Sequence, residues 1–288
     1  MQIKTKHHLT MLVMAGISIA AFPANAVTTT AGDLLFGFRL TTGGNDLIVR
    51  ANSTGTGGNS TVYRDASAAI PSVMDLSAEL VAAFGNDWNT NADLRWGVVG
   101  VRSNSAGSAG SVGNNGVPSA SPFVGIAQSA STPGVKSSTA PDLSFAESQR
   151  VDVANAIVGL RTTFTSLADN GASSLAAATI AASNASSWTT KQSTTFNVGS
   201  GTEVGSANGI DDTGLDLYWI LNQNDGATDN GSAVSSTPGI GVYQGSFQLS
   251  NAGMLSFTPG SAAAIPEPSR TLFAGMGLVA LLFRRRRA

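Results

Sequence analysis

The stretch from Val242 to Phe257 constrains the fold more than any other part of this 288-residue chain. Apolar and polar residues alternate from Val242 to Leu249, as they do in a strand with one buried face. The turn residues Asn251-Ala252-Gly253 follow, and Met254 begins a second apolar run. This pattern predicts a β-hairpin, which is an antiparallel unit.

Several other segments are rich in the β-branched, leucine and aromatic residues that suit a half-buried pleated surface. These predicted strands are Asp33–Leu40, Asp46–Arg50 after a turn at Gly43–Asp46, Leu94–Val101, Phe196–Val204 and Leu215–Leu221. Short turns separate several of them, and no repeat of about 20 to 50 residues is present, which disfavours a solenoid or a propeller.

Two segments carry apolar residues at helical spacing. The first runs from Asp75 to Gly85, with Asp75 as the expected N-cap and Gly85 as the C-terminal stop. The second is Ser144–Ala168.

Residues 103–140 are mostly Ser, Gly, Asn, Ala and Pro, which predicts a long flexible loop. The pattern favours one mainly β, antiparallel, sandwich-like domain with about two helices, and a parallel α/β fold is the alternative.

The chain ends in a tail of three parts: Pro266-Glu267-Pro268, the apolar run Thr271–Phe283, and Arg284-Arg285-Arg286-Arg287. As a helix, the apolar run would span only about 20 Å of a hydrocarbon core of about 30 Å. The four arginines favour an end that stays on the cytoplasmic side. The two prolines separate this predicted membrane helix from the folded body and leave Glu267 exposed.

This order of parts resembles the PEP-CTERM sorting signal of secreted proteins in Gram-negative bacteria, over residues 265–288. The resemblance implies that Pro266, Glu267 and Pro268 are recognised by an exosortase, a membrane-embedded enzyme that removes the tail and releases or attaches the body. The alternative is an ordinary buried helix at the end of a globular domain. Four consecutive arginines and the two glycines Gly275 and Gly277 argue against it.

The amino-terminal end predicts a secretory signal peptide over residues 1–26. Lys4 and Lys6 form the positive region, Leu9–Phe22 is the short apolar region, and Ala24-Asn25-Ala26 is the small-residue cleavage site for signal peptidase. The mature chain would begin at Val27, and residues 27–264 would form the exported domain. A retained amino-terminal anchor is the alternative, which the short apolar region disfavours.

Composition excludes several kinds of chemistry from the exported domain. The chain has no cysteine, and its two histidines, His7 and His8, lie in the predicted signal peptide. A catalytic triad with histidine, a thiolate nucleophile, a zinc site with nitrogen or sulfur ligands and a disulfide framework are therefore excluded.

Seven of the 16 basic and one of the 18 acidic residues lie in the two terminal segments, so residues 27–264 carry a net charge of −8. This charge disfavours nucleic acid as a partner.

Carboxylates are the remaining candidates for acid–base chemistry. The densest group is Asp211, Asp212 and Asp216, with Asp225 and Asp229 beyond the predicted strand. The aromatic residues that could stack on a sugar are Trp219, Tyr218 and Trp88. The favoured interpretation is that these acids lie in turns and that the aromatic residues belong to the core. Residues 222–231 are similar to an oxygen-rich calcium loop but lack its register and terminal Glu, so a polar hairpin loop is favoured. We predict no catalytic residue, metal or cofactor.

The sequence thus predicts a non-enzymatic protein of the cell envelope or extracellular matrix. Its expected partners are signal peptidase, an exosortase, the inner membrane for a limited time, and an exopolysaccharide. The alternative is a secreted carbohydrate-binding module or a glycoside hydrolase that uses carboxylates.

Overall fold

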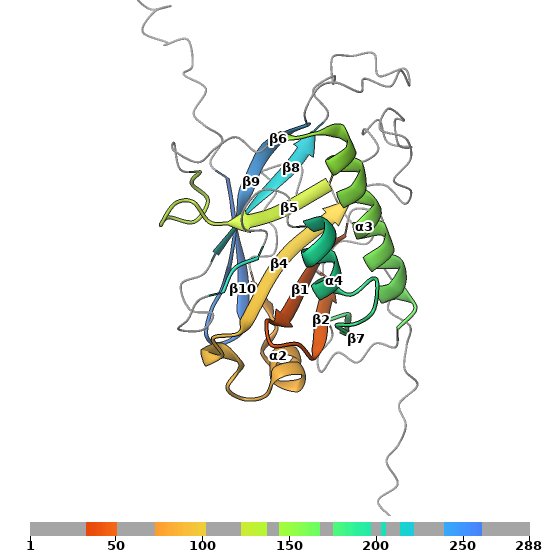
Figure 1. The fold of residues 1–288 in the computed structure, drawn as a ribbon. Helices are drawn as coiled ribbons and strands as arrows, with labels where there is room; N and C mark the ends of the chain where they lie inside the picture. The colour runs from red at the N-terminus through yellow and green to blue at the C-terminus, as the bar shows by residue number, and fades with distance from the viewer. Residues whose placement is uncertain are drawn as a thin grey trace, which may run out of the picture.

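A computed structural model describes residues 33–50, 73–101, 122–136, 144–167, 175–196, 203–205, 214–221 and 239–260. Ten strands of this part of the chain join in one sheet, and every pairing is antiparallel. The strands are β1 (Leu34–Leu40), β2 (Asn45–Arg50), β3 (Val73–Asp75), β4 (Leu94–Val101), β5 (Pro122–Ala127), β6 (Ser144–Phe145), β7 (Ala177–Ala181), β8 (Gly214–Leu221), β9 (Gly239–Leu249) and β10 (Met254–Pro259). Their order across the sheet is β3-β10-β9-β8-β5-β4-β1-β2-β7, and β6 pairs with β9 (Figure 1).

The sheet curls so strongly that distant strands meet across its inner side. Phe36 on β1 and Phe247 on β9 lie four strand positions apart, which is about 19 Å in a flat sheet with strands about 4.8 Å apart. Their ring centroids are nevertheless 5.0 Å apart, in an edge-to-face contact. One curled sheet therefore encloses a core that a sandwich would place between two sheets.

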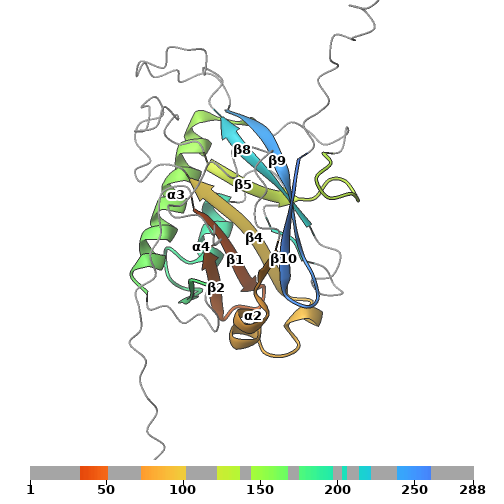
Figure 2. The ribbon, with the colours of Figure 1, turned by 180° about the vertical axis from the view of Figure 1, so that it is seen from behind.

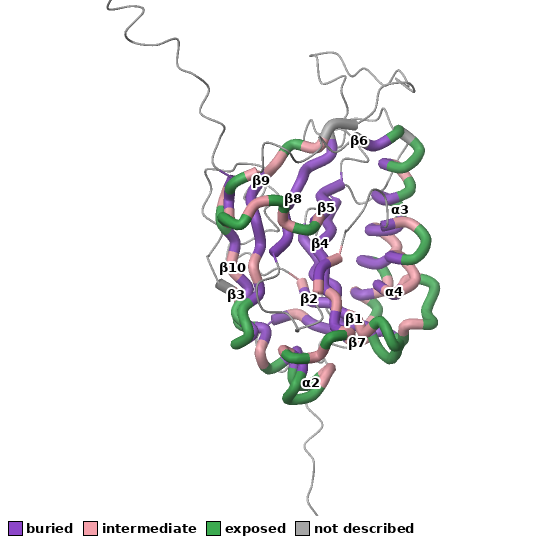
Figure 3. Tube along the Cα trace, turned by 60° about the vertical axis from the view of Figure 1, so that its left-hand side comes forward, coloured by how far each residue is buried: buried purple, intermediate pink, exposed green. Residues whose placement is uncertain are grey.

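Alternation along the strands creates a second core on the outer side of the sheet. On β1, Phe36 and Phe38 belong to the inner core, whereas Leu35 belongs to the outer core. The outer core is covered by α3 (Glu147–Thr165) and α4 (Trp188–Lys191), which lie on the same side of the sheet (Figures 1 and 2). The buried side of α3 faces the strands and its opposite side is exposed (Figure 3).

Two short helical elements close one end of the inner core. These are α2 (Ser77–Phe84) and the 3-10 turn η1 (Trp88–Thr90), which contribute Leu80 and Trp88 to that core. Gly85 ends α2 as predicted, with φ of 87°, and its N–H donates to the carbonyl of Val81. The predicted N-cap is wrong, because Leu76 occupies that position and Asp75 ends β3. The Asp75 carboxylate instead accepts hydrogen bonds from the N–H and hydroxyl of Ser77, at 3.0 and 2.6 Å.

The mainly β, antiparallel fold, the β9–β10 hairpin and both predicted helices are confirmed, within a few residues at their ends. Two local predictions are wrong. Residues 103–140 were predicted to form a flexible loop, but they contain β5, which pairs with β4 and β8. Phe196 ends a π-helix, η2 (Gln192–Phe196), instead of starting a strand, because its ring packs against Trp188; Val204 forms only an isolated bridge to Trp96.

The predicted signal peptide, the tail at 265–288 and the loop at 222–231 lie outside the described residues. The same holds for most of the predicted strand 196–204. Within the described ranges, no helix is both long and apolar enough to cross a membrane.

Candidate functional site

Asp216 lies on β8, in a strand and not in a turn, and its side chain is fully buried. Its Oδ2 accepts hydrogen bonds from the N–H and the hydroxyl of Ser129, at 3.0 and 2.9 Å. Its Oδ1 accepts one from the hydroxyl of Ser246 on β9, at 2.8 Å. These bonds satisfy the carboxylate within the protein. Asp216 therefore anchors the segment after β5 to the sheet.

Ser246 connects this carboxylate to a tyrosine. Because the Ser246 hydroxyl donates to Asp216, it accepts from the Tyr243 hydroxyl at 2.8 Å and from the N–H of Gly134 at 3.1 Å. A bulge in β9 at Gln244 sets this register, since Leu217 faces Gly245 and Tyr218 faces Tyr243. Burial raises the pKa of the Tyr243 hydroxyl to about 12. A phenol with such a pKa remains protonated at neutral pH and acts as a donor.

The three aromatic residues proposed for sugar stacking belong to the core. Trp219 and Trp88 are buried in the inner core, where Trp219 stacks on Phe123 with 5.7 Å between ring centroids. Tyr218 is buried in the outer core and lies beside Tyr243. Their faces are covered by other side chains, as the core interpretation predicts.

The other four acidic candidates, Asp211, Asp212, Asp225 and Asp229, lie outside the described residues. Within the ranges that the structure describes, no group of three or more acidic, histidine or cysteine side chains is arranged to hold a metal ion.

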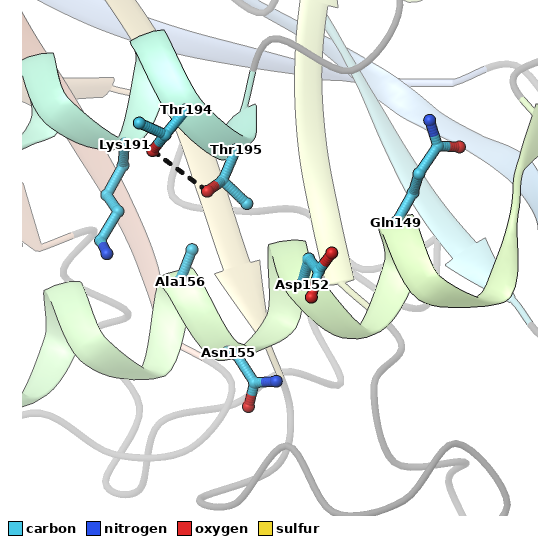
Figure 4. A pocket seen from close by; sticks show the side chains of 7 residues that line it. All are labelled: Gln149, Asp152, Asn155, Ala156, Lys191, Thr194 and Thr195. Carbon is cyan, nitrogen blue, oxygen red and sulfur yellow. Dashed lines mark hydrogen bonds between the residues drawn. The ribbon is translucent and has the colours of Figure 1, made fainter.

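A polar cleft of about 420 Å³ lies on the outer side of the molecule, between α3 and the α4–η2 segment (Figure 4). All but one of its lining residues are polar. They are Gln149, Asp152, Asn155, Ala156, Lys191, Thr194 and Thr195. The sequence carries no signal of this site, because its walls come from two segments that neither share a motif nor adjoin in the chain.

The α4 wall of the cleft is fixed at its start by hydrogen bonds to two side chains. Ser187 is the N-cap of α4 and accepts from the N–H of Thr190 at 3.1 Å. Asp46 on β2 accepts from the N–H and hydroxyl of Thr189, both at 2.7 Å. Burial raises the pKa of the Asp46 carboxyl, and the Thr189 hydrogen bonds oppose that rise. An acidic side chain at a helix start also interacts favourably with the exposed backbone N–H groups.

Trp188 fixes the same wall to the sheet. Its indole lies over Gly37, where a Cβ would overlap the ring. Its Nε1–H donates to Glu203 at 2.6 Å, and Glu203 also pairs with the guanidinium of Arg39 at 2.8 Å. The hydrogen bond to Glu203 raises the pKa of Arg39. Phe196 at the end of η2 packs on Trp188, so aromatic anchors hold the α4–η2 segment at both ends.

The cleft's polar groups are largely available to a ligand. Within the described ranges, neither Asp152 nor Lys191 forms an ion pair, although they carry opposite charges on opposite walls. The Gln149 Oε1 accepts from the N–H of Ala146 at 3.0 Å, which leaves its amide N–H groups for the cleft. The Thr194 hydroxyl donates to the carbonyl of Thr190 at 2.8 Å, so at 3.2 Å it accepts from the Thr195 hydroxyl. Both hydroxyls therefore have their proton engaged within the protein and retain acceptor capacity. The cleft therefore offers donors and acceptors together.

Comparison with known protein families finds no match, and neither a curated protein nor a solved structure matches the chain. The resemblance of residues 265–288 to a sorting signal therefore rests on the sequence alone.

Proposed function

We propose that this chain is a non-enzymatic envelope or extracellular-matrix protein, exported through its signal peptide and sorted by an exosortase through its carboxy-terminal tail. One observation supports the proposal most directly. The described strands begin at Leu34 and end at Pro259, between the predicted cleavage site after Ala26 and the sorting motif that starts at Pro266. Removal of both terminal segments would thus leave every described strand in place.

The two cores suit a body that is exported without disulfides. The chain has no cysteine, and the curled sheet buries apolar side chains on both of its sides. In this proposal, residues 271–283 form a short membrane helix that holds the β-rich body at the inner membrane until processing. Arg284–Arg287 keep the end of the chain on the cytoplasmic side.

The test is expression of the full chain in a Gram-negative host that has an exosortase, with Pro266-Glu267-Pro268 replaced by three alanines. We expect the variant to accumulate at full length in the inner membrane, whereas the parent loses its tail. Fractionation and mass spectrometry of the carboxy terminus measure both outcomes.

A matched control replaces Ser269 and Thr271 by alanine, which changes the same tail but keeps the three motif residues. This control should be processed like the parent. Processing of the triple-alanine variant at the rate of the parent would contradict the role of Pro266, Glu267 and Pro268. Loss of the tail in a host without an exosortase would contradict the role of that enzyme.

A further inference from the structure

Both walls of the polar cleft carry polar side chains, and Asn155 extends from the side of α3 that lies away from the α4–η2 segment (Figure 4). On α3, the lining residues fall within an arc of about 120°, because successive residues of an α-helix are about 100° apart. Opposite them, η2 is a π-helix, whose wider turn reduces the angle between neighbours, so Thr194 and Thr195 both reach the cleft. Figure 4 shows Asp152 and Lys191 extending from these two walls into the space between them.

We propose that this cleft binds a neutral, hydroxyl-rich ligand, namely a saccharide segment of one or two rings. A hydroxyl group both donates and accepts hydrogen bonds, so a polyol requires both kinds of partner. Asp152 supplies only acceptors, Lys191 supplies only donors, and Asn155 supplies both. The two threonine hydroxyls add further acceptors, because their protons are donated within the protein.

The charges of the cleft disfavour other ligand classes. An anion bound by Lys191 would also face the carboxylate of Asp152, and a cation at Asp152 would face the ammonium of Lys191. An apolar ligand would displace water from these polar groups without replacing its hydrogen bonds. A neutral polyol satisfies them without introducing a charge.

The size of the cleft suits such a ligand. Its volume of about 420 Å³ corresponds to about 14 water molecules at ~30 Å³ each. The small side chain of Ala156, which is 7% exposed, forms part of the floor and keeps the cleft open. Since no aromatic ring is among the seven lining residues, we expect weak binding, with Kd roughly in the millimolar range. The inference does not depend on the sorting proposal.

The test is an NMR titration of the protein purified after export of the full chain. The probes are glucose, galactose, mannose, N-acetylglucosamine, maltose and cellobiose, each to roughly 50 mM, with glycine and inorganic phosphate as charged comparisons. We expect at least one saccharide to shift the backbone amides of residues 149–156 and 191–195. The double variant Asp152→Ala/Asn155→Ala should weaken this binding on the order of tenfold or more, because two hydrogen-bonding side chains are lost.

The double variant Asp87→Ala/Asn251→Ala is the matched control, since both positions are exposed and lie outside the cleft. It removes the same two kinds of side chain and should bind like the parent. A second blocking variant, Ala156→Leu, fills the floor and should also abolish the shifts. The proposal is overturned if no saccharide shifts these amides, if the shifts map elsewhere, or if Asp152→Ala/Asn155→Ala binds as well as the parent. Stronger shifts with glycine or phosphate at the same amides would also overturn it.

Discussion

Gly37 provides the space in which the indole of Trp188 lies on the outer side of the sheet. A Cβ at position 37 would overlap three ring carbons of Trp188, which is fully buried and cannot move outward without leaving the core. The substitution Gly37→Ala therefore tests the contact that fixes the α4 wall of the cleft.

The expected loss of stability follows from the contacts that must change. Overpacking of a closed core costs about 1–3 kcal/mol. Displacement of the ring also weakens the hydrogen bond from Trp188 Nε1 to the Glu203 carboxylate, and such bonds to charged groups contribute about 1.5–3 kcal/mol. Alanine recovers about 0.5–1 kcal/mol because it restricts the unfolded chain more than glycine does. We expect Gly37→Ala to reduce the free energy of unfolding by about 2–5 kcal/mol.

Urea denaturation of the exported protein, followed by tryptophan fluorescence, measures this change. Gly159→Ala on α3 is the matched control, because a Cβ there meets only the Ser186 hydroxyl at 3.9 Å. It should stabilise the protein by about 0.5–1 kcal/mol. In a Trp188→Leu background, the cost of Gly37→Ala should fall by more than half. A Gly37→Ala variant within about 0.5 kcal/mol of the parent would refute the packing argument.

Two further predictions concern the buried network around Asp216. Asp216→Ala removes the acceptor of hydrogen bonds from the N–H and hydroxyl of Ser129 and from the hydroxyl of Ser246, so we expect the free energy of unfolding in urea to fall by about 2–4 kcal/mol. The control Asp87→Ala, at an exposed position, should cost less than about 0.5 kcal/mol, and equal losses would contradict the network. For Tyr243, a folded pKa of about 12 lies above the unfolded value of about 10, so the unfolded chain releases this proton first and stability falls as pH rises from about 10 to about 12. Comparison of the parent with Tyr243→Phe by ultraviolet titration should locate the missing ionisation near pH 12, and a missing step near pH 10 would count against burial of the phenol.

Strand and helix positions with a strong local pattern could be predicted from the sequence. The β9–β10 hairpin, β1 and the helix that contains Leu160 were all predicted from their apolar residues. In that helix the spacing of the apolar residues matches their burial, whereas in β9 Val242 is exposed and the polar residues Gln244 and Ser246 are buried. The pattern failed where a neighbour in space decides the conformation. β5 is a short apolar run within a long stretch of small and polar residues, and it becomes a strand between β4 and β8. Phe196 joins a π-helix through its contact with Trp188.

The candidate site shows the same division. Asp216 was selected as one of a dense group of acids, but its partners Ser129 and Ser246 come from other parts of the chain and bury it. The cleft could not be found in the sequence, because Asp152 and Lys191 belong to elements that meet only after the sheet has formed. Nothing in the local pattern of either segment indicates the other.

The sequence by itself determined the class of fold, excluded chemistry that needs histidine or cysteine in residues 27–264, and predicted a targeting signal at each end. Each of these depends on composition or on short-range periodicity, which local stretches of chain carry in full. Only the tertiary structure decided that one sheet curls on itself, that Gly37 admits the ring of Trp188, and that α3 and η2 enclose a polar cleft. These features depend on contacts between residues far apart in the chain, and the packing that selects them exists only when the whole domain is folded.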